Sequence, residues 1–136
     1  MSDKYVYDSY LINLKKDAGR FINSQKIIKK FNSTIWSGID AVKIDSNNKV
    51  ISWPTQLQGT QCAKDAKVKL FKYFLNKSKK KYLLMFEDDI YLHKDLFNDK
   101  IFEKFNKELN IFLKKTDVSI LYLGISSNIN PKKKIY

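Results

Sequence analysis

The segment from Tyr82 to Leu92, YLLMFEDDIYL, constrains the fold of this chain most strongly. Its first five residues are all apolar or aromatic, which is typical of a strand that is covered on both faces. Three consecutive carboxylates, Glu87 to Asp89, follow at the carboxyl end of that strand. A strand of this kind favours an α/β fold, in which a mostly parallel twisted sheet has helices on both faces.

Two interpretations fit the three carboxylates. Neighbouring carboxylates are costly to bury unless a cation or hydrogen bonds offset their charge. The cluster therefore fits a site for Mg²⁺ or Mn²⁺, which prefer oxygen ligands. Because side chains two apart in a strand share a face, Glu87 and Asp89 are expected on one side and Asp88 on the other. The alternative is that the acids end the strand only because they solvate the turn.

Apolar segments and amphipathic segments alternate along the rest of the chain. Strands are predicted at Tyr7–Leu14, Ser33–Trp36, Tyr82–Phe86 and Val118–Leu123, with a short one at Val50–Trp53. Apolar residues at helical spacing predict helices at Asp17–Lys30, Gly59–Asn76 and Leu96–Lys115. This order of elements is the order expected for the parallel α/β sheet.

Polar residues and glycines follow the predicted strands. In parallel sheets, ligands bind at the carboxyl ends of the strands. The residues at or just past those ends are Asn13, Gly38, Asp40, the acidic segment Glu87–Asp89, and Gly124. Their coincidence at one edge of the sheet favours the ligand-binding interpretation of the acidic segment.

The composition describes one globular domain. The chain has 136 residues, of which 43% are hydrophobic, and no apolar run approaches the roughly 20 residues of a membrane span. The amino terminus, MSDKYVYD, does not have the pattern of a secretory signal. A single cysteine, Cys62, excludes an internal disulfide and a cysteine-based metal cluster. The expected compartment is the cytoplasm.

The formal net charge of +12 raises the question of nucleic-acid binding. Arg20 is the only arginine, although arginine is the preferred residue for bidentate contacts to phosphate or guanine. The lysines are spread along the chain in short clusters. A lysine-rich nucleic-acid binder is therefore the least favoured class, and the charge fits better a field that attracts an anionic small molecule or polyanion.

Five short motifs, taken in order, resemble the glycosyltransferases of GT-A fold, and most closely the lipopolysaccharide-biosynthesis and collagen-galactosyltransferase family. The motifs are Ile12–Leu14 followed by Arg20, then Gly38–Asp40, Gly59–Cys62, Glu87–Asp89 and Tyr122–Gly124. The resemblance implies a GT-A-like domain over residues 1–125, with a Rossmann-like nucleotide-binding half. Residues 126–136 are expected to form a polar, basic tail.

This resemblance implies a metal-dependent transfer of a hexose from a UDP-sugar donor to a glycan or protein acceptor. Mn²⁺ or Mg²⁺ would stabilise the negative charge on the departing diphosphate. Asp89 corresponds to the direct metal ligand, and Glu87 would support the ion through water or hold the ribose. Asp88 would orient the loop or a sugar hydroxyl, with a cap for the following turn as its alternative role.

Three further residues would contact the nucleotide by the same resemblance. Asn13 and Asp40 would meet the uracil and the ribose, and Arg20 would contact the diphosphate. An Asx turn is the alternative for Asn13, and simple solvation is the alternative for Arg20. The sequence nominates no general base for the acceptor hydroxyl.

Two departures from the family pattern leave other functions open. The family usually has a Ser-His pair after the cysteine, where this chain has Lys64 and Asp65. It also normally continues beyond the Tyr-Leu-Gly motif with a segment that completes the acceptor pocket, whereas this sequence ends at Tyr136. The alternatives are a catalytically inactive module that binds a nucleotide sugar or a protein, and one half of an oligomer or other assembly.

Overall fold

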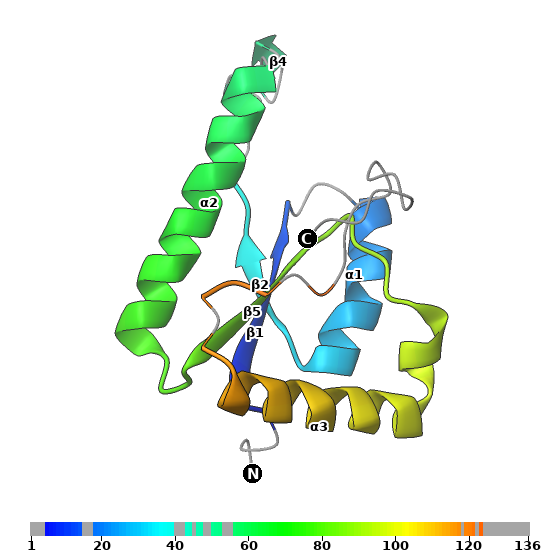
Figure 1. Ribbon diagram of the computed structural model, residues 1–136. Helices are drawn as coiled ribbons and strands as arrows, with labels where there is room; N and C mark the ends of the chain where they lie inside the picture. The colour runs from blue at the N-terminus through cyan, green and yellow to red at the C-terminus, as the bar shows by residue number, and fades with distance from the viewer. Residues whose placement is uncertain are drawn as a thin grey trace, which may run out of the picture.

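The alternation of strands and helices is present in the computed structural model, which describes residues 5–14, 18–39, 43–44, 46–47, 50–52, 56–117, 119–121 and 123 (Figure 1). The strands are β1 (Tyr7–Asn13), β2 (Thr34–Ser37), β3 (Lys43–Ile44), β4 (Val50–Ser52) and β5 (Tyr82–Glu87). The helices are α1 (Ala18–Phe31), α2 (Gln56–Lys77) and α3 (Asp99–Lys115), and the 3-10 helix η1 (Lys94–Phe97) precedes α3. None of the helices in these described ranges is long and apolar enough to cross a membrane.

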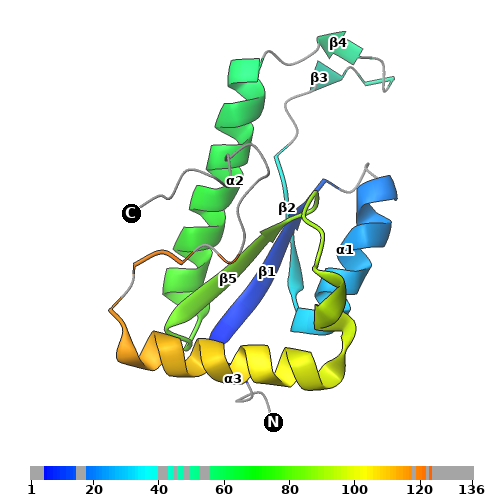
Figure 2. The ribbon, with the colours of Figure 1, turned by 45° about the vertical axis from the view of Figure 1, so that its right-hand side comes forward.

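The main sheet is parallel and has β1 at its centre. β1 pairs with β2 on one side and with β5 on the other, which gives the order β2-β1-β5. In this register Leu11 lies opposite both Ile35 of β2 and Phe86 of β5. β3 and β4 form a separate antiparallel pair, drawn beyond the sheet in Figure 2. The predicted α/β class is thus confirmed.

Helices cover both faces of the main sheet. Buried and half-buried residues alternate along β1, so every second side chain points to the face shared with α1 and α3. The other face packs against α2, where Trp36 Nε1 donates a hydrogen bond to the carbonyl of Ala66 at 3.2 Å. On the same face, the ring of Tyr10 lies 6.3 Å from the ring of Tyr73. The sheet is therefore a middle layer, as the apolar run of β5 predicts.

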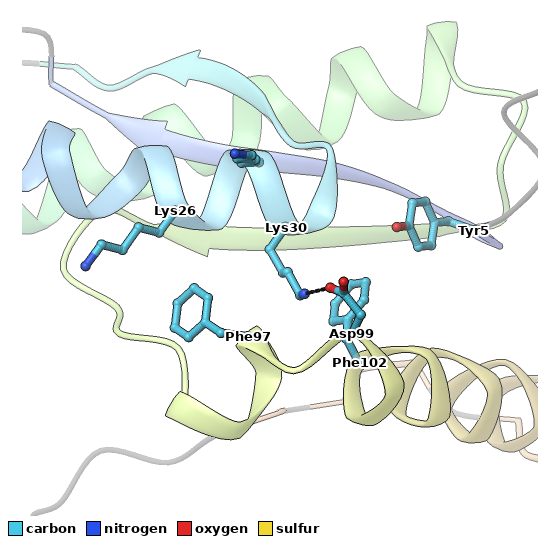
Figure 3. A pocket seen from close by; sticks show the side chains of 7 residues that line it. Tyr5, Lys26, Lys30, Phe97, Asp99 and Phe102 are labelled. Carbon is cyan, nitrogen blue, oxygen red and sulfur yellow. Dashed lines mark hydrogen bonds and ion pairs between the residues drawn. The ribbon is translucent and has the colours of Figure 1, made fainter.

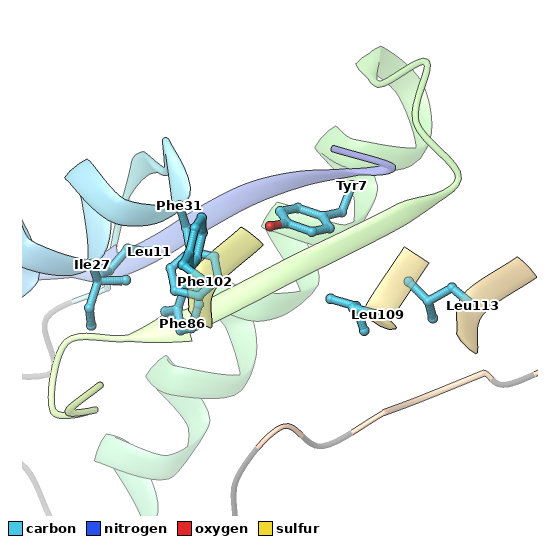
Figure 4. Close-up of a cluster of buried hydrophobic side chains, with 8 residues drawn as sticks. All are labelled: Tyr7, Leu11, Ile27, Phe31, Phe86, Phe102, Leu109 and Leu113. Atoms are coloured by element: carbon cyan, nitrogen blue, oxygen red, sulfur yellow. The ribbon is translucent and has the colours of Figure 1, made fainter. Parts of the chain in front are cut away.

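The core on the α1 and α3 face is built around one aromatic ring (Figure 4). Phe31, at the end of α1, is 2% exposed. Its ring centroid lies 4.9 Å from that of Phe86 in β5 and 5.1 Å from that of Phe102 in α3. Leu11 and Ile27 complete this contact and are fully buried. The cluster joins α1 and α3 to the strands β1 and β5.

The connections reverse direction between β1 and β5. The chain leaves β1 through α1 to reach β2, and it returns through α2, on the opposite face, to reach β5. The carboxyl ends of β1 and β5 therefore lie at the point where the strand order reverses. In open α/β sheets this switch point is where ligands bind.

Two of the predicted helix starts differ from the structure by three residues. The helix predicted from Leu96 begins as η1, and α3 begins only at Asp99. The reason is the side chain of Asn98, which accepts hydrogen bonds from the backbone of Lys100 and Ile101 and so caps α3. α2 begins at Gln56, three residues before the predicted start at Gly59.

The strand predicted at Val118–Leu123 is wrong for the residues that are described there. Positions 119–121 and 123 have no strand structure, and Ile120 is 73% exposed. An apolar segment becomes a strand only when a neighbouring strand takes up its backbone hydrogen bonds. Within the described residues, β5 pairs only with β1. Val118, Tyr122, Gly124, Asp40 and the predicted tail lie outside the described residues.

Phe31 should dominate the stability of this core. We expect Phe31→Ala to lower the free energy of unfolding by about 3–5 kcal/mol, because it removes a buried ring and leaves a cavity. Phe71→Ala is the matched control, since Phe71 lies on α2 and is 43% exposed. That control should cost less than about 1 kcal/mol in a urea denaturation followed by circular dichroism. Equal losses for the two variants would contradict the described packing.

Candidate functional site

The candidate site lies at the carboxyl ends of β1 and β5, and three elements contribute to it. Asn13 is the last residue of β1, and Asp88 directly follows β5. The parallel register places Ile12 opposite Glu87. Asn13 and Asp88, the residues that follow these two, therefore lie next to each other at the edge of the sheet. Arg20 projects from the first turn of α1. We call these residues the Asn13–Asp88–Arg20 cluster.

The cluster is held by one tight hydrogen bond and one longer contact. Asn13 Nδ2 donates to Asp88 Oδ2 at 2.9 Å, and both residues are buried. Arg20 Nη1 donates to the other carboxylate oxygen, Oδ1, at 3.4 Å. The side chain of Arg20 is 53% exposed, whereas that of Asp88 is 11% exposed. Asp88 therefore joins the buried end of β1 to a cationic group at the surface.

One polar atom of the cluster has no partner among the described residues. Asn13 Oδ1 is buried, and no described donor reaches it. A buried amide oxygen without a hydrogen bond costs about 1–3 kcal/mol, so such atoms commonly mark a site for water or a ligand. The backbone oxygen of Asn13 is satisfied, because it accepts a hydrogen bond from the backbone of Gly38 at 3.0 Å. The available acceptor is thus the side-chain oxygen.

Gly38 keeps the end of β2 close to this edge. A Cβ atom at position 38 would lie 3.1 Å from Leu14 Cδ2, which is closer than ordinary van der Waals contact. A larger residue at position 38 would crowd Leu14, which explains the glycine of the predicted Gly38–Asp40 motif by packing. Asp40 itself lies outside the described residues, and its predicted role stays a prediction.

The other two acids of the motif lie apart from the cluster. Glu87 turns to the α2 face, where its carboxylate forms an ion pair with Lys67. Asp88 lies on the opposite face, as strand alternation predicts. The alternation of side chains between the two faces of the sheet ends at Asp88, because the chain turns after β5. In this turn Ile90 N donates a hydrogen bond to the carbonyl of Glu87 at 3.3 Å. Asp89 is exposed in this turn.

The described residues alone do not form a closed metal cage. No three His, Cys, Asp or Glu side chains within the described ranges come together. Mg²⁺, however, is commonly bound by one or two protein carboxylates together with phosphate oxygens of a substrate. Glu87 is paired with Lys67 and Asp89 is exposed in the turn, so a metal site on these two carboxylates stays a prediction.

Three further side chains, those of Lys67, His93 and Asp65, have contacts that the sequence does not reveal. Lys67 is one of several lysines in α2, and no spacing or motif distinguishes it as the partner of Glu87. His93 accepts a hydrogen bond from the backbone of Asp95 through Nδ1 at 3.3 Å. That bond caps η1, so the structure gives His93 a structural role. Asp65 accepts a hydrogen bond from Gln61 on the surface of α2 at 2.9 Å.

The hydrogen bond between Asn13 and Asp88 should contribute measurably to the free energy of unfolding. We expect Asp88→Ala to lower the free energy of unfolding by about 1–3 kcal/mol, because it leaves the buried Asn13 amide without its acceptor. Asp89→Ala, next in the chain and exposed, should change it by no more than about 0.5 kcal/mol. Urea denaturation of the two variants provides the comparison. A larger loss for Asp89→Ala would show that the turn is built differently.

Comparisons with known proteins do not assign a family to this chain. It matches no family model, no curated protein and no solved structure. The fold class is therefore an observation, whereas the family resemblance rests on the sequence motifs. Of these motifs, the end of β1, Arg20 and the acidic segment after β5 are described at one edge of the sheet.

Proposed function

We propose that this domain binds a nucleotide sugar and is a metal-dependent glycosyltransferase that uses a UDP-sugar donor. The donor would lie at the carboxyl edge of β1 and β5, and the acceptor would be a glycan or a protein. The observation that supports this most is the Asn13–Asp88–Arg20 cluster at the point where the strand order reverses. This is the place where open α/β sheets bind nucleotides.

The unsatisfied oxygen of Asn13 suits the base or ribose of a nucleotide. Asn13 Oδ1 is a buried acceptor, and a uracil N–H or a ribose hydroxyl can donate to it. Its amide group is held in place by the bond to Asp88, so the acceptor is oriented before any ligand arrives. In the proposal, Asn13 thus orients the nucleoside and Asp88 orients Asn13.

The charges of the described residues at this edge favour a metal ion with the donor. Asp88 pairs with Arg20 and Glu87 pairs with Lys67, so with Asp89 the five groups have a net charge of 2 − 3 = −1. A diphosphate would be repelled by that excess. A divalent cation reverses the sign, and it supplies Lewis-acid stabilisation of the departing diphosphate.

The side chains have distinct roles in this proposal. Asp89 and Glu87 would hold the cation, since they are the exposed and half-buried carboxylates of the edge. Arg20 is the exposed cation beside Asp88 and would contact the diphosphate. Lys67 neutralises Glu87 in the absence of donor, and it would have to share that carboxylate with the ion.

A catalytically inactive nucleotide-sugar-binding module is the second candidate. Glu87 and Asp88, two of the three motif acids, both contact cationic side chains. Such pairing neutralises these two acids in the absence of a ligand and does not require chemistry. Release of UDP from a UDP-sugar by the purified protein separates the two candidates, because an inactive module binds the donor without consuming it.

Calorimetric titration with UDP-glucose and UDP-galactose tests the proposal. We expect saturable binding of at least one of them that requires Mn²⁺, and we expect Asp89→Asn to weaken it about tenfold or more, since one charge-assisted ligand is lost. Asp117→Asn is the control, because Asp117 is an exposed aspartate beyond the end of α3. Binding that is absent, or equally strong without metal, would count against the proposed function.

A further inference from the structure

We propose that the domain has a second binding site, for a small organic phosphate with a flat apolar ring, between α1, η1 and the start of α3 (Figure 3). An open hollow of about 680 Å³ lies there on the surface. It is lined by Tyr5, Lys26, Lys29, Lys30, Phe97, Asp99 and Phe102.

This hollow is separate from the candidate site at the carboxyl edge. Tyr5 precedes β1, and Lys29 and Lys30 lie in the last turn of α1. The carboxyl-edge cluster instead uses Asn13 at the end of β1 and Arg20 in the first turn of α1. The residues that line the hollow and those of the Asn13–Asp88–Arg20 cluster do not overlap. Binding at the hollow can therefore be measured separately from binding at the carboxyl edge.

Three lysines bring an excess of positive charge to one face of α1. Lys26, Lys29 and Lys30 are spaced three and four residues apart, which places like charges on neighbouring turns. Among the described residues that line the hollow, Asp99 is the only acid, so these residues have a net charge of 3 − 1 = +2. The negative end of the helix dipole stabilises the charges of Lys29 and Lys30 in the last turn of α1, but Lys26 lies outside that turn. An anion in the hollow would relieve the repulsion.

The ion pair between Lys30 and Asp99 in the hollow is weak. Lys30 Nζ lies 3.0 Å from Asp99 Oδ1, and it also lies 4.6 Å from the centroid of the Phe102 ring. The side chain of Lys30 is only 14% exposed, whereas that of Asp99 is 93% exposed. Ion pairs with such an exposed partner are weak. A phosphate can therefore replace the Asp99 carboxylate while Lys30 stays in position.

The aromatic lining indicates the rest of the ligand. Phe102 is buried and forms part of the wall beneath Lys30, whereas Phe97 in η1 is 48% exposed. Phe97 and Lys26 both line the hollow (Figure 3). A flat apolar ring can stack on an exposed aromatic side chain while its phosphate meets the ammonium groups. Aryl phosphates have this combination.

Chemical-shift titration of the ¹⁵N-labelled full chain with phenyl phosphate tests this site. We expect saturable shifts at the amides of Lys26 to Lys30, Phe97 and Phe102, and inorganic phosphate should bind at the same amides but more weakly. The amide signals of Asn13 and Asp88 should not move, which separates this result from the proposed nucleotide-sugar site. Shifts confined to the carboxyl edge, or absent everywhere, would overturn the proposal.

A charge-removal pair provides the matched comparison. Lys26→Gln with Lys29→Gln should weaken phenyl phosphate about tenfold or more. Lys69→Gln with Lys72→Gln removes the same charge at the same spacing from the exposed surface of α2 and should leave the affinity unchanged. Equal weakening by both pairs would show that net charge alone attracts the phosphate.

Sedimentation with phosphatidic acid vesicles, if it occurred without binding of phenyl phosphate, would overturn the small-ligand assignment in favour of a membrane headgroup.

Discussion

Parallel pairing of β1 with β5 is the constraint from which the candidate site follows. The two strands are separated in the chain by α1, β2, β3, β4 and α2, yet their register brings Asn13 and Asp88 to one edge. The hydrogen bond between these side chains then joins residues 75 positions apart. Because the bond is buried, it contributes both to the stability of the sheet edge and to the orientation of the polar groups there.

The sequence predicts the layers of this fold better than its details. The unbroken apolar run of Tyr82–Phe86 predicts a strand covered on both faces, and β5 lies between α2 and the layer of α1 and α3. The cap at Asn98 is local and shifts the start of α3. The segment after α3 is apolar enough for a strand, but strand formation depends on a partner that sequence pattern does not specify.

The candidate site could be predicted only in part for the same reason. Position at a strand end identifies Asn13 and the acidic segment, since parallel strands share their carboxyl edge. The division of the acids between two faces, with Glu87 held by Lys67 and Asp88 held by Asn13, depends on long-range packing. The unsatisfied Asn13 oxygen and the lysine-lined hollow at the other end of α1 are likewise visible only in three dimensions.

Paramagnetic broadening by Mn²⁺ tests the central claim most directly. The claim is that a nucleotide diphosphate and a divalent cation meet at the carboxyl edge of β1 and β5. With UDP present, Mn²⁺ should broaden the amide signals of Asn13 and of residues 87–90, while those of Phe31 and Phe102 in the core stay sharp. If Mn²⁺ and UDP broadened no signals at this edge, or broadened them uniformly over the domain, the account would be contradicted.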